Sequence, residues 1–399
     1  MIARSMQKRN CSRANRIVKK IPTIVTFLAF ATASDSFKGP SKPSAAPFPS
    51  GIPSPAFSLQ GAATDTSLMT TGTTWSEDTE NRHTVLERCM IPLSASSYKG
   101  SSGRVGVLGG SAKYTGAPYY AAMASLKCGA DLAFCFCAEE AAVPLKTYSA
   151  ELMVQPVYNA GAFDKAVRGH ESEEGTTEEA YDDEETKKLV HQMVEDVCSM
   201  MEKMHVLVLG PGLGRCPLVF EATARIIQRA QSEYHLPLVI DADALFLLTL
   251  PKYHNLLTDD SLVILTPNAM ELRRLRDSHP NAEGFPARCI VIEKGAVDSI
   301  RPGSTNSAMP TIACGEVGGL KRSGGIGDIL AGTCGTLVAW NRILTNRNKS
   351  SEEDLPLACW TACCFVKRAT KKAFDRHRRS MTAPDILEEL GPAIDEMTF

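Results

Sequence analysis

The stretch KRSGGIGDILAG, residues 321–332, places several glycines around a single carboxylate, Asp328. Glycines allow backbone N–H groups to approach a phosphate closely, and a helix that begins near Asp328 would direct its positive end at the same anion. A carboxylate there can accept the proton of a substrate hydroxyl while that hydroxyl attacks a phosphate. The alternative is that Asp328 only caps the helix. The glycines, together with the strand ends described next, favour the chemical role.

Polar or glycine-rich residues follow five expected strands, at residues 109–111, 210–214, 241–243, 266–268 and 294–295. Ligands of open parallel sheets bind at the carboxyl ends of the strands, so these residues predict a site for a large polar ligand. The segment GPGLG at 210–214 lacks the spacing of a GxGxxG fingerprint, and with Asp241 it is only a weak signal for a Rossmann oxidoreductase. The chain has no GxxxxGK[ST] segment, which excludes a P-loop.

Asn268 and Glu271 lie one helical turn apart, and an amide and a carboxylate there suit Mg²⁺ bound through water, because Mg²⁺ keeps several of its waters. The same spacing fits a capping box at a helix start, and the sequence leaves both interpretations open. Lys294, at a strand end, could pair with a phosphate or be solvated. Because buried lysines are rare, we interpret Lys294 as functional.

The elements that must position these residues alternate along the chain. Short β-branched runs end near residues 108, 138, 209, 240, 265 and 293, and helix-compatible segments such as 117–130, 218–234 and 269–277 separate most of them. After the glycine loop the chain is expected to be mostly helical. This order predicts an α/β fold with a central, mostly parallel sheet flanked by helices.

Composition excludes several classes of protein. The 399 residues carry a net charge of -2, which gives no basic surface for nucleic acid. Thirteen scattered cysteines in a chain of this length indicate free thiols, mostly in the core, rather than a disulfide scaffold. An acidic run at residues 171–185, with nine acids and no base, is expected to be a solvated surface loop.

The first 85 residues are expected to form a targeting leader and a disordered linker. Residues 1–20 hold seven basic residues and no acid, and a short apolar run then ends in a small-residue cleavage site. These features fit a mitochondrion or a plastid, with the secretory route and the cytoplasm as alternatives. The apolar run is too short for stable membrane insertion. The folded domain is therefore expected over residues 86–399.

Six segments in order carry a resemblance to a known family. They are residues 103–132, which include YTGAPYYAA, and the segments LVLGPGLGR, VIDADAL, LTPNAMEL, EKGAVD and KRSGGIGDILAG. Over about residues 86–399 the chain resembles the NAD(P)H-hydrate dehydratases of the ribokinase-like superfamily, and especially their ATP-dependent eukaryotic members.

The resemblance implies a repair reaction in which hydrated NADH or NADPH, in its S form, is dehydrated at the expense of ATP. It implies phosphorylation of the C6 hydroxyl with Asp328 as base, then loss of phosphate, and NADHX, NADPHX and ATP as ligands. It implies hydrate contacts at Gly214, Asn268, Ala269, Met270, Glu271, Leu272, Arg273, Arg274 and Asp328. It implies nucleotide contacts at Lys294, Gly295, Ala296, Val297, Asp298, Gly318, Gly319, Leu320, Lys321, Arg322, Ser323, Gly324, Gly325, Ile326 and Gly327.

Two positions depart from the family pattern, since Ile326 stands where glutamine is usual and Ala269 where histidine is usual. The backbone N–H of residue 326 survives that change, so we expect activity to persist. A separate epimerase is the expected pathway partner, and a homo-oligomer is possible. The alternatives are a small-molecule kinase of the same superfamily and a silent nucleotide-binding protein.

Overall fold

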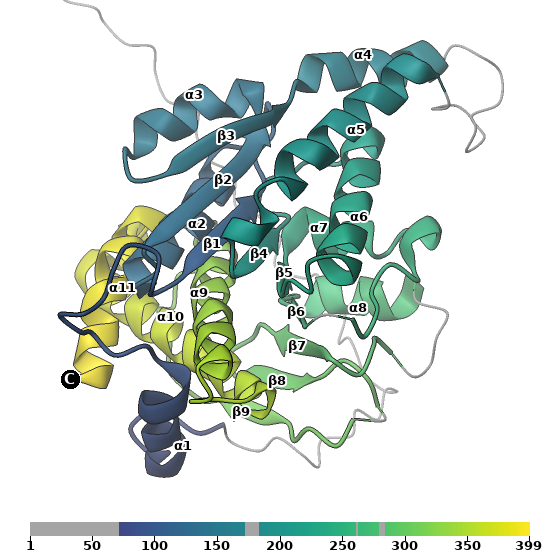
Figure 1. Ribbon diagram of the computed structural model, residues 1–399. Helices are drawn as coiled ribbons and strands as arrows, with labels where there is room; N and C mark the ends of the chain where they lie inside the picture. The colour runs from purple at the N-terminus through teal and green to yellow at the C-terminus, as the bar shows by residue number, and fades with distance from the viewer. Residues whose placement is uncertain (1–71, 172–182, 261, 279–283, 306) are drawn as a thin grey trace, which may run out of the picture. The chain divides into compact units, whose positions relative to one another are not determined.

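Figure 1 shows the computed structural model. It describes residues 72–171, 183–260, 262–278, 284–305 and 307–399. Residues 1–71 of the predicted leader and linker, and most of the acidic run, lie outside the described residues. The described chain forms α-helices around one central sheet.

The described strands form a single sheet in the order β3-β2-β1-β4-β5-β6-β7-β8-β9. Neighbouring strands from β3 to β7 pair in parallel, and β8 and β9 extend the sheet as antiparallel strands. The strands are β1 (Arg104–Leu108), β2 (Leu132–Ala138), β3 (Met153–Tyr158), β4 (Val206–Leu209), β5 (Leu238–Ile240), β6 (Val263–Leu265), β7 (Cys289–Glu293), β8 (Asp298–Pro302) and β9 (Ile312–Cys314).

Alternate residues of the strands enter two separate cores, as the pleat of a strand requires. Val206 and Val208 of β4 pack in one core, whereas Leu207 and Leu209 pack in the other. The first core contains α2 (Gly116–Cys128), α9 (Ile326–Asn346), α10 (Leu355–His377) and α11 (Ala383–Thr398). The second contains residues of α3 (Glu139–Tyr148), α4 (Ala160–Glu171), α5 (Glu184–Cys198), α6 (Pro217–Ser232), α7 (Ala242–Leu247) and α8 (Ala269–Ser278).

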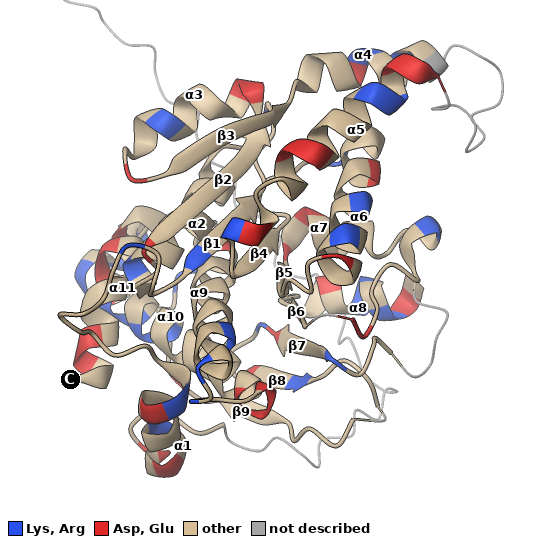
Figure 2. Ribbon diagram, viewed as in Figure 1, with Lys and Arg blue, Asp and Glu red and all other residues tan. Residues whose placement is uncertain are grey.

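The sheet is therefore covered by helices on both faces, and the α/β prediction is confirmed. Figure 2 shows that charged residues gather on the helices and loops, while the strands are mostly uncharged. All six strands expected from the sequence are present. The sequence analysis missed β3, β8 and β9, which lie toward the two edges of the sheet. β3 contains Pro156, and β8 contains Asp298 and Arg301, so neither carries the continuous apolar run of a buried strand.

The folded part begins before residue 86, earlier than the expected boundary. Thr73 pairs through its backbone with Ala313 and Gly315, next to β9. Trp75 is 2% exposed, and its ring stacks on Trp360 with 5.7 Å between ring centroids. The short helix α1 (Thr79–Thr84) follows, and then a π-helical turn, Val85–Cys89.

The ends of the acidic run belong to helices rather than to a loop. Asp183 caps α5 by accepting a hydrogen bond from the N–H of Thr186 at 2.9 Å, and Glu184 and Glu185 lie in the first turn of that helix. The cysteine prediction is confirmed for the described residues, where every cysteine is a free thiol and only Cys216 is not buried. No helix in the described part of the chain has the length and apolar character needed to cross a bilayer.

Trp75 gives a test of this N-terminal contact. We expect Trp75→Ala to lower the free energy of unfolding by about 3–5 kcal/mol, because it removes a buried ring from a packed core. The substitution also removes the donor that the indole Nε1 provides to the carbonyl of Met397 at 2.8 Å. Denaturant unfolding measures the change. Leu93→Ala is the control, since Leu93 is 86% exposed and its loss should cost less than about 0.5 kcal/mol. Equal stability of the two variants would contradict the assigned packing.

Candidate active site

Two cavities meet at the glycine loop before α9. Cavity A, of about 980 Å³, includes Gly325 and Asp328 in its lining. Cavity B, of about 500 Å³, includes Ser323, Ile326 and Gly327. The loop at residues 323–328 thus forms a wall between two cavities at the carboxyl-end edge of the sheet, where the sequence predicted a ligand site.

Asp328 is the third residue of α9, and the residue before the helix is Gly325. Gly325 has a φ of 94°, and a Cβ there would lie 2.6 Å from the Cβ of Ala383 and 2.9 Å from the ring of Tyr120. Only glycine fits this position without strain. The N-cap position of α9 is therefore taken by Gly325 and not by Asp328. Its carboxyl group stands in the first turn, where the N–H groups have no acceptor within the helix.

A buried ion pair lies under the loop. The ammonium of Lys294 donates to a carboxylate oxygen of Asp241 at 2.8 Å, and Thr266 donates its hydroxyl to the same oxygen at 2.8 Å. A Cβ on Gly327 would lie 3.3 Å from Nζ of Lys294. The Lys294 ammonium is also 3.8 Å from Glu271. Burial lowers the pKa of Lys294, but Asp241 and then Glu271 outweigh it, so the pKa is raised and Lys294 is charged.

The surroundings of Asp328 suit a general base. Burial, then the carboxylate of Asp241, raise the pKa of Asp328 to about 7, against the opposing effect of the Lys294 ammonium. Asp243 adds a smaller effect in the same upward direction. A base with a pKa near the working pH combines a useful deprotonated fraction with a strong driving force for proton uptake.

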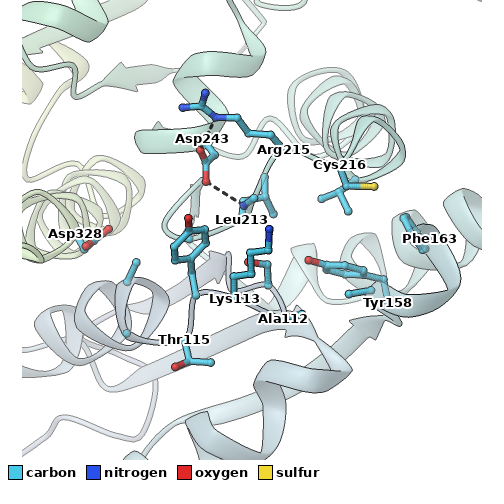
Figure 3. A pocket seen from close by; sticks show the side chains of 18 of the residues that line it. Ala112, Lys113, Thr115, Tyr158, Phe163, Leu213, Arg215, Cys216, Asp243 and Asp328 are labelled. Atoms are coloured by element: carbon cyan, nitrogen blue, oxygen red, sulfur yellow. Dashed lines mark hydrogen bonds and ion pairs between the residues drawn. The ribbon is translucent and has the colours of Figure 1, made fainter. Parts of the chain in front are cut away.

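Cavity A is lined mainly by residues that the sequence analysis did not assign to the site. They include Ser111, Lys113, Tyr114, Thr115, Tyr120, Tyr158, Asp164, Arg215 and Asp243. Figure 3 shows Asp243 between Arg215 and the loop of Leu213. The carboxylate of Asp243 accepts from the N–H of Gly214 at 2.9 Å and from Nε of Arg215 at 3.1 Å. The stretch YTGAPYYAA, which begins at Tyr114, and the second acid of DAD, Asp243, are the sequence signals that point to this lining.

The predicted hydrate contacts are spread over different surroundings. Gly214 and Asp328 line cavity A, whereas Asn268 lines cavity B. Glu271 and Arg274 line a smaller cavity of about 120 Å³ that also contains Asp243. Leu272 is in the core. The remaining predicted contacts are exposed and line none of these cavities: Ala269, Met270 and Arg273.

Asn268 and Glu271 form the capping arrangement at the start of α8. The side-chain oxygen of Asn268 accepts the N–H groups of Met270 and Glu271, each at 3.0 Å. Glu271 in turn accepts the N–H of Asn268 at 2.8 Å. Both side chains are therefore committed to the helix start, which favours the structural interpretation of their spacing.

Most predicted nucleotide contacts line cavity B: Lys294, Gly295, Ala296, Asp298, Gly318, Gly319, Arg322, Ser323, Ile326 and Gly327. Gly325 lines cavity A instead, and Val297, Leu320, Lys321 and Gly324 line neither. The sequence analysis missed Lys367, whose ammonium donates to the carbonyls of Gly295 and Ala296 at 3.1 and 2.6 Å.

Asp298 supports the turn between β7 and β8 that borders cavity B. Its carboxylate accepts the N–H of Gly295 at 2.8 Å and lies 3.4 Å from the Lys367 ammonium. Burial raises the pKa of Asp298, while Lys367 opposes that rise. Ile326, the first residue of α9, is half-buried and packs against the first core, so the atypical residue closes part of cavity B with an apolar surface.

Comparisons with known proteins show the family to which the chain belongs. A family model described as NAD(P)H-hydrate dehydratase matches residues 105–392. An ATP-dependent (S)-NAD(P)H-hydrate dehydratase from Pediculus humanus subsp. corporis is 34% identical over 310 residues, covering 74% of this chain and 90% of that protein. The human protein of the same name is 32% identical over 335 residues, covering 80% of this chain and 86% of that protein.

Solved structures share the fold at lower sequence identity. The ADP/ATP-dependent NAD(P)H-hydrate dehydratase from Bacillus subtilis has a TM-score of 0.55 at 17% identity, covering 82% of this chain and 99% of that one. A ribokinase-like superfamily protein from Enterococcus faecalis has a TM-score of 0.53 at 20% identity, covering 78% and 94%. With the family match over most of the folded part, the chain belongs to the NAD(P)H-hydrate dehydratase family.

Proposed function

We propose that this enzyme is a lyase that dehydrates the S form of hydrated NADH and NADPH, with ATP as co-substrate, and so restores the reduced nucleotides. The observation that carries the proposal is the loop at residues 323–328, which separates two cavities and presents Asp328 to cavity A. ATP in cavity B would place its terminal phosphate at the start of α9. The hydrate in cavity A would place its hydroxyl at Asp328.

The geometry supports a reaction in two stages. Asp328 takes the proton from the C6 hydroxyl of the hydrate as that oxygen attacks the terminal phosphorus of ATP, and ADP leaves. The first N–H groups of α9 and the ammonium of Lys294 face the phosphate from cavity B. The ring nitrogen's lone pair then expels phosphate from C6. Loss of a proton from C5 restores the ring double bond.

The proposed reaction includes Mg²⁺, which few protein side chains would bind directly. The fold relative from Bacillus subtilis was co-crystallised with ATP and Mg²⁺. Asn268 and Glu271 fit the ion only through water, because both are occupied at the start of α8. The described residues contain no cluster of three or more His, Cys, Asp or Glu side chains able to hold a metal. Bound mainly by the nucleotide's phosphates, Mg²⁺ would offset the charge that develops during transfer.

Three further proposals concern the enzyme's setting. A separate epimerase would convert the R form of the hydrate into the S form that this enzyme consumes. The basic leader within residues 1–85 would direct the enzyme to a mitochondrion or a plastid. In a homo-oligomer each chain would hold one complete site, because both cavities are lined by residues of a single chain.

Asp328→Asn tests the assigned base. We expect kcat/KM for hydrated NADH to fall by about 10²–10⁴-fold, because the amide cannot accept the proton. Nucleotide binding should survive. The assay follows the return of the reduced-nicotinamide absorbance with ATP present, and calorimetry follows ATP binding. Asp395→Asn is the control, because Asp395 is exposed on α11 and should leave turnover unchanged. Full activity of the Asp328 variant would exclude Asp328 as the base.

The raised pKa of Asp328 predicts a pH dependence. Because the deprotonated carboxylate is the active form, kcat/KM should rise with pH and level off above about 7. Since the folded pKa exceeds the unfolded value of 3.8, the folded state binds the proton more tightly, and Asp328 lowers stability as pH rises from about 4 to 7. Asp328→Asn should therefore raise the melting temperature more at pH 8 than at pH 5. An equal effect at both pH values would show that the carboxyl titrates normally.

Removal of magnesium tests the ion's part in the reaction. We expect EDTA in excess over ATP and metal to abolish turnover, and added Mg²⁺ to restore it, because uncompensated phosphate charge opposes the transfer. The absorbance assay measures both steps. Turnover that persists in EDTA would remove Mg²⁺ from the proposal.

A further inference from the structure

The two cations that line cavity A differ in how they are compensated. Arg215 pairs with Asp243 and lies over the ring of Phe246 at 4.0 Å. Lys113 is exposed in the loop that follows β1, and none of the described carboxylates is within 4.0 Å of its ammonium. In Figure 3 the Lys113 side chain rises toward the loop of Leu213. Cavity A therefore contains one cation that no described acid neutralises.

A second donor in the same loop also lacks a partner. The hydroxyl oxygen of Ser111 is buried, and no hydrogen-bond partner is present for it among the described residues. A Cβ on Gly214 would lie 3.5 Å from this oxygen, so the loops after β1 and β4 approach each other closely here. This oxygen has almost no accessible surface and lies under Gly214, so it is not open to a ligand in cavity A. Lys113 is therefore the group of this loop that suits an anionic ligand.

The two ends of cavity A are chemically different. Asp328 lies at one end, as Figure 3 shows, and Tyr158 and Phe163 lie at the other. Asp164 follows Phe163 in α4 and also lines the cavity. Its carboxylate would repel a phosphate, but it can accept hydrogen bonds from ribose hydroxyls. A phosphate group is therefore best placed between the two ends, near Lys113.

We propose that Lys113 binds the diphosphate of the hydrated dinucleotide. The hydrated ring then lies toward Asp328, and the adenosine lies toward Tyr158, Phe163 and Asp164. This assignment rests on the proposed function, and it adds the orientation of the substrate. Lys113 is a binding residue that acts on the substrate far from the reacting bond, so its loss should raise KM and leave kcat within about twofold.

Lys113→Ala in the full chain tests the assignment with three substrates. They are the hydrates of NADH, of NADPH and of reduced nicotinamide riboside, which has the same ring and ribose but no phosphate. We expect kcat/KM for both dinucleotides to fall by about tenfold, which corresponds to one charge-assisted contact. The riboside hydrate should be affected less than twofold. Lys146→Ala is the matched control, because Lys146 is an exposed lysine of α3 that lines none of the cavities.

The other outcomes would overturn the assignment. A loss confined to hydrated NADPH would place Lys113 at the 2′-phosphate. An equal loss with the riboside would show a structural effect, and no loss would show no contact.

Binding of NADH, which has the same diphosphate, separates this proposal from the proposed function. If the native chain turned over no hydrate but Lys113→Ala weakened NADH binding about tenfold, the diphosphate assignment would stand and the dehydration would fall. Unchanged NADH binding would overturn the assignment.

Discussion

The buried ion pair between Asp241 and Lys294 is the contact on which the arrangement of the site depends. The two residues follow β5 and β7, and Thr266, after β6, donates to the same carboxylate, so one hydrogen-bonded group joins three neighbouring strand ends. Burying such a pair gains little stability over a well-packed apolar group, so its presence points to a role in the site. That role is the field at Asp328, whose pKa is raised by burial and then by the Asp241 carboxylate, against the lowering effect of the Lys294 ammonium.

The backbone around this pair is also constrained. A Cβ on Gly210 would lie 1.8 Å from the carbonyl oxygen of Asp241, so the ends of β4 and β5 can approach this closely only with glycine there. Ala242 has a φ of 48°, which is unusual for a residue with a side chain and costs conformational energy. The carboxylate of the next residue, Asp243, accepts hydrogen bonds from the N–H of Gly214 and from Arg215 in the wall of cavity A. The two acids of this segment thus have different partners, since Asp241 pairs with Lys294.

The sequence alone predicts those elements whose residue pattern is contained in one short segment. Buried strands and the glycine loop carry their own patterns, so the central strands and Asp328 could be placed from residue types alone. Edge strand β3 could not, because Gln155 and Pro156 interrupt its apolar run and only its last two residues are buried. Trp75 could not be placed either, because its neighbours Trp360 and Phe365 lie far along the chain. For Asn268 and Glu271, one spacing fitted a cap and a metal site equally, and the hydrogen bonds of the structure show that both side chains form the cap.

The C-terminal helix shows why the loop holds its shape before any ligand arrives. Ala383, the first residue of α11, and Tyr120 of α2 close on Gly325 so tightly that even a methyl group would not fit. The N-terminal segment contacts the chain before the loop, since the N–H of Trp75 donates to Glu316 at 2.8 Å, two residues before Gly318 in the wall of cavity B. The tight packing at Gly325 keeps the amides and the carboxylate of the loop in place. Donors fixed in advance stabilise a transition state without reorganisation during the reaction, so packing far from the chemistry contributes to catalysis.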